Sequence, residues 1–325
     1  MKGAVVYKPL GKENLKFEDV NVPEPGKGEI RVGFERAGMN PIDYNVVAGK
    51  VVYSLAPFPH IPGSEVMGVA KSDGKRIRKG DKVIIYPRIF CGNCDMCLTS
   101  REYMCTNGGL WGVVSNGGYA EEFNINEDNL FKMPQGMDPD VAVSLPIGGL
   151  TAYHALIRAG ASHEKRILIY GASGNTGIFA TQLASHFGME VHAVSRKEWV
   201  KDYGASEVYD PDSVPENLKV DIVMNSLGQK FWKDSLSHLS AGGSLVTFGV
   251  LTGKEAEVDI AALYTAERTI IGSTGGSRKE LLDLADITAR KGLKVRVAKR
   301  FKLADIKEAL DYFPKVKDGR LILEA

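Results

Sequence analysis

The feature that most constrains the fold is a pattern at residues 166–195, RILIYGASGNTGIFATQLASHFGMEVHAVS. A buried apolar strand, RILIY, leads into a glycine turn, and a helical pattern then places Ile178 and Leu183 on one apolar face. Gly188 is suited to end that helix, and EVHAV forms a second apolar strand. Further apolar runs follow, separated by helix-like spacers. This part of the chain therefore predicts a doubly wound α/β fold with a parallel sheet.

The glycine turn, GASGNTG, has the composition of a phosphate-binding loop. Glycines let the backbone approach a pyrophosphate, and the N-terminus of the next helix supplies free N–H groups and a positive dipole end. Ala172 stands where a strict GxGxxG has its first glycine. We predict dinucleotide binding, with a purely structural turn as the alternative. The candidate residues lie in the turn and after two later strand ends: Gly171, Ser173, Gly174, Asn175, Thr176, Gly177, Asn225, Ser226, Leu227, Phe248 and Gly249.

The residues after the second strand favour NADP(H) over NAD(H). NAD-binding proteins usually carry an acid at this strand end, where it holds the ribose 2′-OH. Here the strand ends in Ser195, and Arg196 and Lys197 follow, which can pair with a 2′-phosphate. A solvated start of the next helix is the alternative for these two cations.

The length and the changes in pattern predict two domains, because one core rarely grows past ~250–300 residues and the chain has 325. Residues 1–129 are rich in short alternating runs separated by Gly and Pro, which predicts an irregular β-rich domain. Residues 130–275 carry the α/β pattern. The tail, 276–325, has an amphipathic helix and a short strand, and we expect it to complete the first domain.

Composition limits the partners. Hydrophobic residues make up 44% and charged residues 25%, and the net charge is +1, so neither nucleic acid nor an acidic membrane surface is expected as a partner. We found no apolar run of the ~20 residues that span a bilayer. The first residues lack the apolar region of a signal peptide. We therefore expect a cytoplasmic protein with reduced thiols, acting on a small molecule.

All four cysteines lie in CGNCDMCLTSREYMC, as Cys91, Cys94, Cys97 and Cys105. The spacing C-x₂-C-x₂-C-x₇-C supplies four thiolates, enough to close a tetrahedral zinc shell with no open position. Closed zinc sites are structural, so we predict one structural zinc. Two disulfides and an iron–sulfur cluster are the alternatives.

Several motifs together resemble the medium-chain dehydrogenase/reductase superfamily: KGDKVIIYP, the four-cysteine segment, SLPIGGLTAYHAL, the glycine turn and DGRLILEA. The resemblance covers nearly the whole chain. It implies a GroES-like catalytic domain, completed by the C-terminal tail, and a Rossmann domain that binds the cofactor. It also implies a homodimer or homotetramer.

The resemblance breaks at the catalytic zinc of the alcohol dehydrogenases in that superfamily. Asn40 stands where the family has a cysteine ligand, and Ser64 stands where it has a histidine. The third ligand position offers Ile147 or Gly148. Amide and hydroxyl groups are poor zinc ligands, so we predict that no catalytic zinc binds. AGMNPIDYNVVAGK and LPIGGLTAYHAL are instead similar to stretches of the quinone oxidoreductase group, although that group usually lacks the cysteine segment.

This second resemblance implies NADPH-dependent reduction of quinones or of activated C=C or C=O acceptors. The candidate catalytic residues are Asn40, as a hydrogen-bond donor or a nicotinamide contact, Asp43 and Tyr44 in the same loop, and Tyr53, which like Tyr44 could line the pocket or donate to the acceptor; the resemblance places Thr151 beside the nicotinamide. A turn cap is the alternative for Asn40 and for Asp43, half-buried packing for the tyrosines, and a helix N-cap for Thr151. The competing functions are a zinc alcohol dehydrogenase with unconventional ligands and a non-catalytic NADPH-binding protein.

Overall fold

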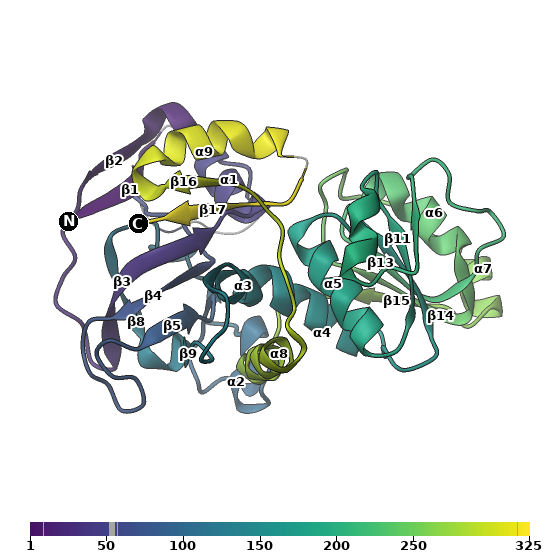
Figure 1. The fold of residues 1–325 in the computed structure, drawn as a ribbon, viewed down its shortest axis with the longest axis horizontal. Coiled ribbons are helices and arrows are strands. Elements are labelled where there is room, and N and C mark those ends of the chain that lie inside the picture. The colour runs from purple at the N-terminus through teal and green to yellow at the C-terminus, as the bar shows by residue number, and fades with distance from the viewer. Residues whose placement is uncertain (9, 52–55, 57, 317) are drawn as a thin grey trace. The chain divides into compact units, whose positions relative to one another are not determined.

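In the computed structural model, residues 1–8, 10–51, 56, 58–316 and 318–325 are described, and the chain divides into two compact units (Figure 1). Unit 1 comprises Met1–Ile147 and Ser277–Ala325, and unit 2 comprises Gly148–Gly276. The boundary expected at residue 130 therefore lies further along the chain. The reason is that β9 (Leu130–Lys132) pairs with β5 of unit 1, and α3 (Pro139–Ser144) packs against β3 of the same unit.

Unit 1 is β-rich. Its other strands are β1 (Lys2–Val6), β2 (Leu15–Asp19), β3 (Glu29–Gly38), β4 (Val66–Ala70), β5 (Lys82–Ile85), β6 (Arg88–Ile89), β7 (Gly109–Leu110), β8 (Glu122–Asn126), β16 (Val297–Lys302) and β17 (Arg320–Glu324), and its other helices are α1 (Pro41–Ala48), α2 (Asp95–Leu98), α8 (Arg278–Lys291) and α9 (Ile306–Tyr312). The main sheet has the order β16-β17-β3-β4-β5-β9, and β8 also pairs with β3.

The long strand β3 organises this sheet. It pairs antiparallel with β4, β8 and β17, so the C-terminal tail closes on the first part of the chain. Val32 and Phe34 of β3 pack in one core with Leu321 and Leu323 of β17 and with Leu310 of α9. The amphipathic helix predicted in the tail corresponds to α9, with Ile306 and Leu310 buried.

Unit 2 has the predicted doubly wound fold. Its strands are β10 (Arg166–Tyr170), β11 (Glu190–Val194), β12 (Glu207–Tyr209), β13 (Val220–Asn225), β14 (Leu239–Thr247) and β15 (Thr269–Gly272), and its helices are α4 (Leu150–Arg158), α5 (Asn175–His186), α6 (Trp232–Ser237) and α7 (Ile260–Thr265). All pairs are parallel, in the order β12-β11-β10-β13-β14-β15. This is the 3-2-1-4-5-6 order of a Rossmann sheet, so the predicted fold class is confirmed.

The central strand, the turn and the helix of this unit follow from the sequence pattern. Ile167, Leu168 and Ile169 of β10 are all buried, because a central parallel strand is covered on both faces. Helix α5 follows the glycine turn, and Gly188 stands just past its end with φ near 77°, as a C-terminal glycine requires. The turn thus lies at the carboxyl end of the first strand, where such sheets bind their ligands.

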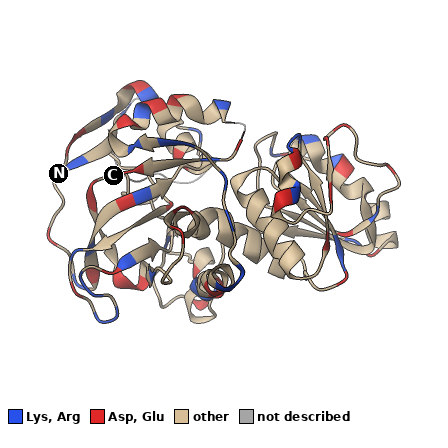
Figure 2. Cartoon of the chain, in the orientation of Figure 1, with Lys and Arg blue, Asp and Glu red and all other residues tan. Residues whose placement is uncertain are grey.

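One helical stretch bears on the expectation about membrane spans. Residues 139–158 are long enough to cross a bilayer, and a window of 18 residues within them has a mean hydropathy of 1.2, although the stretch includes Asp140 and Arg158. Of that window, 83% is buried within the protein, as is usual for a core helix. Both Lys and Arg and Asp and Glu are spread over the two units (Figure 2), in keeping with the near-neutral net charge.

Candidate functional site

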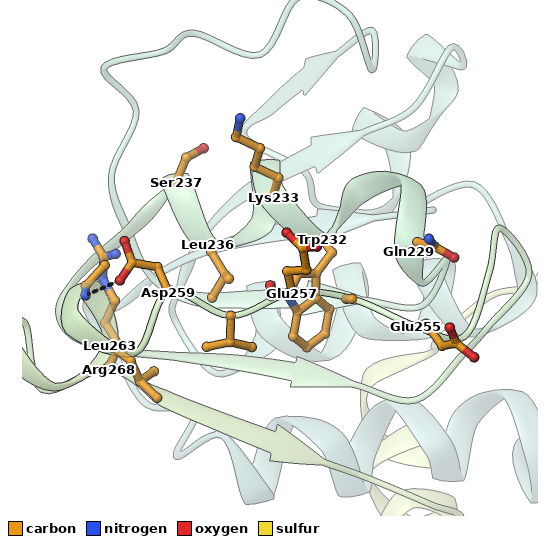
Figure 3. Close-up of a pocket in the computed structure, with 13 residues that line it drawn as sticks. Gln229, Trp232, Lys233, Leu236, Ser237, Glu255, Glu257, Asp259, Leu263 and Arg268 are labelled. Carbon is orange, nitrogen blue, oxygen red and sulfur yellow. Dashed lines mark hydrogen bonds between the residues drawn. The ribbon is translucent and has the colours of Figure 1, made fainter.

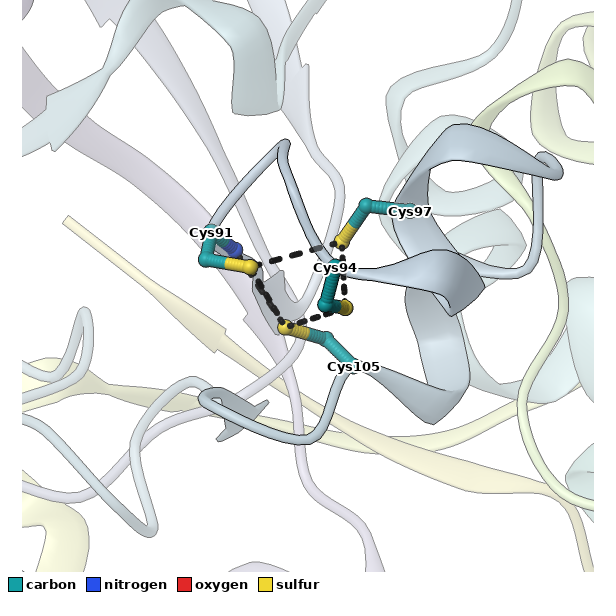
Figure 4. A group of neighbouring side chains, drawn as sticks. All are labelled: Cys91, Cys94, Cys97 and Cys105. Carbon is teal, nitrogen blue, oxygen red and sulfur yellow. Dashed lines mark hydrogen bonds between the residues drawn. The ribbon is translucent and has the colours of Figure 1, made fainter.

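The four cysteines converge, and we call residues 91–105 the cysteine lobe (Figure 4). Their Sγ atoms all lie within 4.8 Å of one another. Sγ–Sγ distances are 3.6 Å for Cys94–Cys97 and Cys91–Cys105, and 3.9 Å for Cys91–Cys97 and Cys94–Cys105. A tetrahedron with Zn–S bonds of 2.3 Å has edges of ~3.8 Å, so the four sulfurs fit one zinc ion.

The lobe favours thiolates rather than disulfides. Its cysteines are unpaired, and a disulfide would need sulfurs ~2.05 Å apart. Backbone N–H groups of Cys97 and Thr106 lower the pKa of the Cys94 thiol to about 5, whereas burial raises the pKa of the Cys97 thiol to about 12; a coordinated metal ion would deprotonate both. Four thiolates close the shell, so this zinc would brace the loop and leave no position for a substrate.

Glu102 connects the cysteine lobe to α8. This side chain is 5% exposed, and its Oε1 accepts a hydrogen bond of 2.6 Å from the backbone N–H of Arg278. The Arg278 guanidinium lies over the Phe90 ring, 4.7 Å from its centroid, with Nε 3.5 Å from Glu102 Oε1. A carboxylate at the first turn of α8 also complements the positive end of the helix dipole. The lobe therefore holds the start of α8.

A second site in unit 1 surrounds Glu65, and we call Asn40, Asp43, Ser64, Glu65 and Arg320 the buried polar cluster. Each of these residues is at most 4% exposed. Arg320 of β17 donates to Glu65 Oε2 over 2.5 Å, and Asn40 Nδ2 donates to the same oxygen over 2.8 Å. The other oxygen, Oε1, accepts the N–H of Ile147 at 2.8 Å. Glu65 therefore joins three segments that are far apart in sequence.

The cluster requires a glycine at position 38. A Cβ there would lie 1.6 Å from Arg320 Nη2 and 2.6 Å from Glu65 Oε2, closer than atoms can approach. The ion pair therefore occupies the space that a side chain on the last residue of β3 would fill.

Asp43 holds the other side of the cluster. Its Oδ2 accepts the backbone N–H of Asn40 at 2.9 Å, and its Oδ1 accepts that of Ser64 at 2.9 Å. Burial raises the pKa of Asp43 to about 6; these two N–H groups lower it and the Glu65 charge raises it. Burial, and then the Asp43 carboxyl, raise the pKa of the Tyr119 hydroxyl well above its usual range. With one cation beside two carboxyls, the cluster is suited to hold a proton near neutral pH.

The structure changes the role expected for Asn40. Its two amide hydrogens are directed to Glu65 and to Gly38 O, the latter at 3.2 Å, so neither is available to donate to a ligand. Asn40 is the N-cap of α1, and Asp43 at the third helical position completes a capping box with it, which are the alternatives considered from the sequence for both residues. Tyr44 stacks on Phe313 with ring centroids 5.7 Å apart, which is packing against the C-terminal segment. Tyr53 lies outside the described residues.

In unit 2 the glycine turn has the backbone that a pyrophosphate needs. Gly171 has φ near 77°, and a Cβ on Gly177 would lie 2.2 Å from Gly171 O, so both positions require glycine. A Cβ on Gly174 would meet only Gly171 O, at 3.3 Å, and would otherwise project into open space. Because Gly174 is the N-cap of α5, no N-cap side chain competes for the first amide groups of the helix. The turn therefore fits a dinucleotide phosphate.

The other candidate cofactor residues have different roles. The Asn225 side chain is buried: it accepts from the N–H groups of Leu227 and Gly228 and donates to Gly228 O and Ser235 Oγ, so it shapes the turn after β13. Ser226 Oγ donates to Tyr170 O at 3.0 Å.

The remaining candidates border these turns. A Cβ on Gly249 would lie 2.0 Å from Ser226 O, so Gly249 lets two strand ends approach. A Cβ added to Gly148 would lie 2.1 Å from Asn175 Nδ2, so the Asn175 amide occupies the space beside this glycine. Four further candidates are half-buried: Thr151, Ser173, Thr176 and Phe248.

The residues predicted to read the ribose adjoin an acid that the sequence reasoning missed. Ser195 is 6% exposed, and its Oγ accepts the N–H of Lys197 at 3.1 Å. The Nε of Arg196 lies 3.5 Å from Oδ2 of Asp210. Asp210 follows β12, and the neighbouring position of β11 and β12 in the sheet is the signal that could have found it.

The sequence reasoning also missed Arg320, and it treated Glu65 as merely structural. The signal was available in DGRLILEA, where one arginine leads an apolar strand. A buried charge needs a partner of opposite sign, and Asp43 and Glu65 are acidic residues in equally apolar stretches, so they were the candidate partners.

A cavity of about 980 Å³ in unit 2 contains none of the candidate residues (Figure 3). It lies among α6, α7 and the segment between β14 and α7, with Trp232 and Leu236 on its apolar side. Glu255, Glu257 and Asp259 line it together with Lys233 and Arg268. These mixed charges favour no ligand of one sign, so the cavity adds nothing to the candidate sites.

Comparisons with known proteins agree on one group. The family described as "Alcohol dehydrogenase GroES-like domain" matches residues 26–135, and "Zinc-binding dehydrogenase" matches residues 176–290. A solved thermostable alcohol dehydrogenase from Pyrobaculum aerophilum is 36% identical, with a TM-score of 0.93, over 100% of this chain and 99% of that one.

Two curated relatives differ in the reaction that their names describe. The NAD-dependent alcohol dehydrogenase of Sulfolobus acidocaldarius is 28% identical over 100% of this chain and 99% of its own length. The acryloyl-coenzyme A reductase of Sulfurisphaera tokodaii is 28% identical over 100% of both chains.

Proposed function

This chain belongs to the medium-chain dehydrogenase/reductase superfamily, and from that premise we propose that it reduces a quinone or an activated C=C or C=O acceptor by hydride transfer, without a catalytic metal. The chain is an oxidoreductase of a family that uses pyridine nucleotides, and its cysteine lobe is suited to zinc.

The observation that carries the proposal is the donor set of the buried polar cluster. Asn40 and Ser64 stand where the resemblance expects zinc ligands, and Asn40 directs both amide hydrogens into the cluster. Arg320 already neutralises Glu65, over 2.5 Å. Among the described residues, the cysteine lobe is the one group of three or more His, Cys, Asp or Glu side chains placed to hold a metal. The cluster thus offers an amide oxygen and a hydroxyl, which are weak zinc ligands.

This donor set suits a conjugated acceptor better than a simple carbonyl. Reduction of a simple ketone develops an alkoxide, which needs a Lewis acid or strong donors. A quinone or an enone delocalises the incoming charge over its own conjugated system. The name of the acryloyl-coenzyme A reductase, a relative over the full chain, describes such an acceptor and supports this choice.

For the cofactor, we propose binding at the glycine turn. When bound, the reduced nicotinamide supplies the hydride. Gly171 and Gly177 let the backbone approach the pyrophosphate, and the first amides of α5 hold its charge. Arg196 and Lys197 support a preference for NADP(H).

An alcohol dehydrogenase is the second candidate, because two relatives over the full chain carry that name. It would need metal ligation by the groups of the buried polar cluster. Metal analysis separates the candidates: one zinc per chain supports a metal-free reaction, whereas two per chain would defeat it.

The test is a screen for oxidation of NADPH and NADH with quinones, enals, enones, enoyl thioesters and simple aldehydes, with and without a chelator. We expect turnover of the conjugated acceptors, unchanged when chelator is added during the assay. If alcohols and NADP⁺ reacted best and chelation stopped the reaction at once, the metal-free mechanism would be wrong. Tight NADPH binding without turnover of any acceptor would indicate a non-catalytic protein.

A matched pair of variants tests the cluster. Asn40→Ala removes the donor to Glu65, and we expect it to lower kcat by at least tenfold if the cluster supports the reaction. Asn45→Ala on the same helix α1 removes an amide outside the cluster and should leave kcat within about twofold.

We further propose a homo-oligomer. Among the described strands β15 pairs with β14 alone, so its other edge can accept a second copy. Ile260 and Tyr264 of α7, in the segment before β15, are 72% and 70% exposed. Light scattering should give a dimer or tetramer, and Ile260→Lys should lower the mass. A reducing compartment such as the cytoplasm, which keeps the four thiols reduced, fits the proposal.

A further inference from the structure

Two adjacent strand ends in unit 2 carry charges of opposite sign. Strands β11 and β12 run parallel, with Val194 opposite Tyr209, and the N–H of Ser195 donates to Tyr209 O at 2.8 Å. A charged residue comes just past each strand end: Arg196 follows Ser195, and Asp210 follows Tyr209. Arg196 Nε lies 3.5 Å from Asp210 Oδ2, so the arginine that would read the ribose is paired with an acid from the neighbouring strand.

Asp210 is held in place by its own turn. Its Oδ1 accepts the N–H of Asp212 at 3.2 Å, and its backbone oxygen accepts the N–H of Ser213 at 2.9 Å. One carboxylate oxygen therefore anchors the side chain locally, while the other faces Arg196. Asp210 is therefore fixed by its own turn, whereas the exposed Arg196 side chain is held by the ion pair.

Both side chains of the pair are exposed, so a ligand can replace Asp210 as the partner of Arg196. The side chains of Arg196 and Asp210 are 66% and 47% exposed, and exposed ion pairs contribute little to stability. A phosphate could therefore take over the guanidinium, but it would have to approach Asp210 as well.

We infer that Asp210 is a specificity-determining residue of the dinucleotide site, which lets the site accept NAD(H) as well as NADP(H). This inference rests on the proposed function, because it assumes a dinucleotide at the glycine turn. The carboxylate can accept a hydrogen bond from the ribose 2′-OH, the role that Rossmann proteins usually give to an acid on the second strand. The same charge repels a 2′-phosphate and competes with it for Arg196.

Binding of two small probes tests this without any assay of turnover. 2′,5′-ADP carries the 2′-phosphate and 5′-AMP does not, and calorimetry measures the Kd of each. In Asp210→Asn the amide oxygen keeps the bond from the Asp212 N–H but loses the charge. We expect 2′,5′-ADP to bind about tenfold more tightly and 5′-AMP not to gain, because one charge a few ångströms from a phosphate is worth ~1–2 kcal/mol in water. Arg196→Gln should weaken 2′,5′-ADP about tenfold and leave 5′-AMP within about twofold.

Asp212→Asn is the matched control, since it removes the same charge two residues away and should change both Kd values by less than about twofold. If Asp210→Asn shifts the ratio of the two Kd values no more than this control does, the inference is overturned. The shift should shrink in 0.5 M salt, because exposed charges are screened; a shift that survives unchanged would contradict the electrostatic role. If the unaltered protein binds neither NADP⁺ nor NAD⁺, the proposed function fails, and that outcome differs from intact binding with an unchanged ratio.

Discussion

Breaking the ion pair between Arg320 and Glu65 should be among the most costly single substitutions in unit 1. The Arg320 side chain is 2% exposed and the Glu65 side chain 0% exposed, with the two charges 2.5 Å apart. Arg320→Met keeps much of the volume but leaves Glu65 buried beside Asp43 without a cation. Removing one partner of a buried pair costs ~3–5 kcal/mol. For a unit of this size, that lowers Tm by roughly 6–20 °C.

The measurement is urea or thermal unfolding at fixed pH and metal content, with two comparisons. Arg290→Met breaks a surface pair with Asp286, whose side chains are 66% and 63% exposed, and should cost no more than ~0.5 kcal/mol. The double variant Arg320→Met with Glu65→Gln removes both charges and should recover at least half of the loss. If Arg320→Met cost under 1 kcal/mol, or if the double variant were no better, the buried charge would not be the cause.

Three further predictions concern pH, the glycine turn and the metal. Burial raises the pKa of Asp43 to about 6 from ~3.9 in the unfolded chain, so the folded state binds this proton more tightly. The free energy of unfolding should therefore fall by ~3 kcal/mol as the pH rises from about 4 to 6. Asp43→Asn should remove this pH dependence in urea titrations, and the same dependence in the variant would contradict the prediction. Gly177→Ala should destabilise unit 2 by ~1–3 kcal/mol, because its Cβ would meet Gly171 O, whereas Gly174→Ala should fold normally and lose dinucleotide affinity; equal unfolding curves for the two would refute this. A strong chelator should release one zinc per chain and lower Tm, and Cys94→Ser should bind less than a tenth of an equivalent in metal analysis.

Much of the fold could be predicted because its signals are local. The strand, turn and helix of residues 166–188 are written in one continuous stretch, and the cysteine spacing defines a ligand set without knowledge of the rest. The boundary between the units, which lies after Ile147 and not near residue 130, could not be placed from local signals. It depends on the pairing of β9 with β5, which joins Leu130 to Ile85 across 45 residues and leaves no local mark.

The buried polar cluster shows why the site could be predicted only in part. Asn40 and Ser64 were found by comparing positions, but the direction of the Asn40 amide depends on Glu65, and Glu65 depends on Arg320, which is 255 residues further along. Asp210 was missed for the same reason, because it meets Arg196 through the pairing of two strands. Polar contacts between distant segments follow from the sheet order, which has to be known first.

The chain passes from unit 1 to unit 2 after Ile147 and returns at Ser277, and a buried glutamate of unit 1 holds an amide at each passage. Glu65 accepts the N–H of Ile147, and Glu102 of the cysteine lobe accepts that of Arg278. A metal ion in the cysteine lobe would then stabilise the start of α8, where the chain re-enters unit 1, as well as the lobe itself. Deuterium uptake of amides 277–281 after chelation measures this, and we expect it to rise well before uptake in β3 does; simultaneous rises would show that the lobe acts only through global stability.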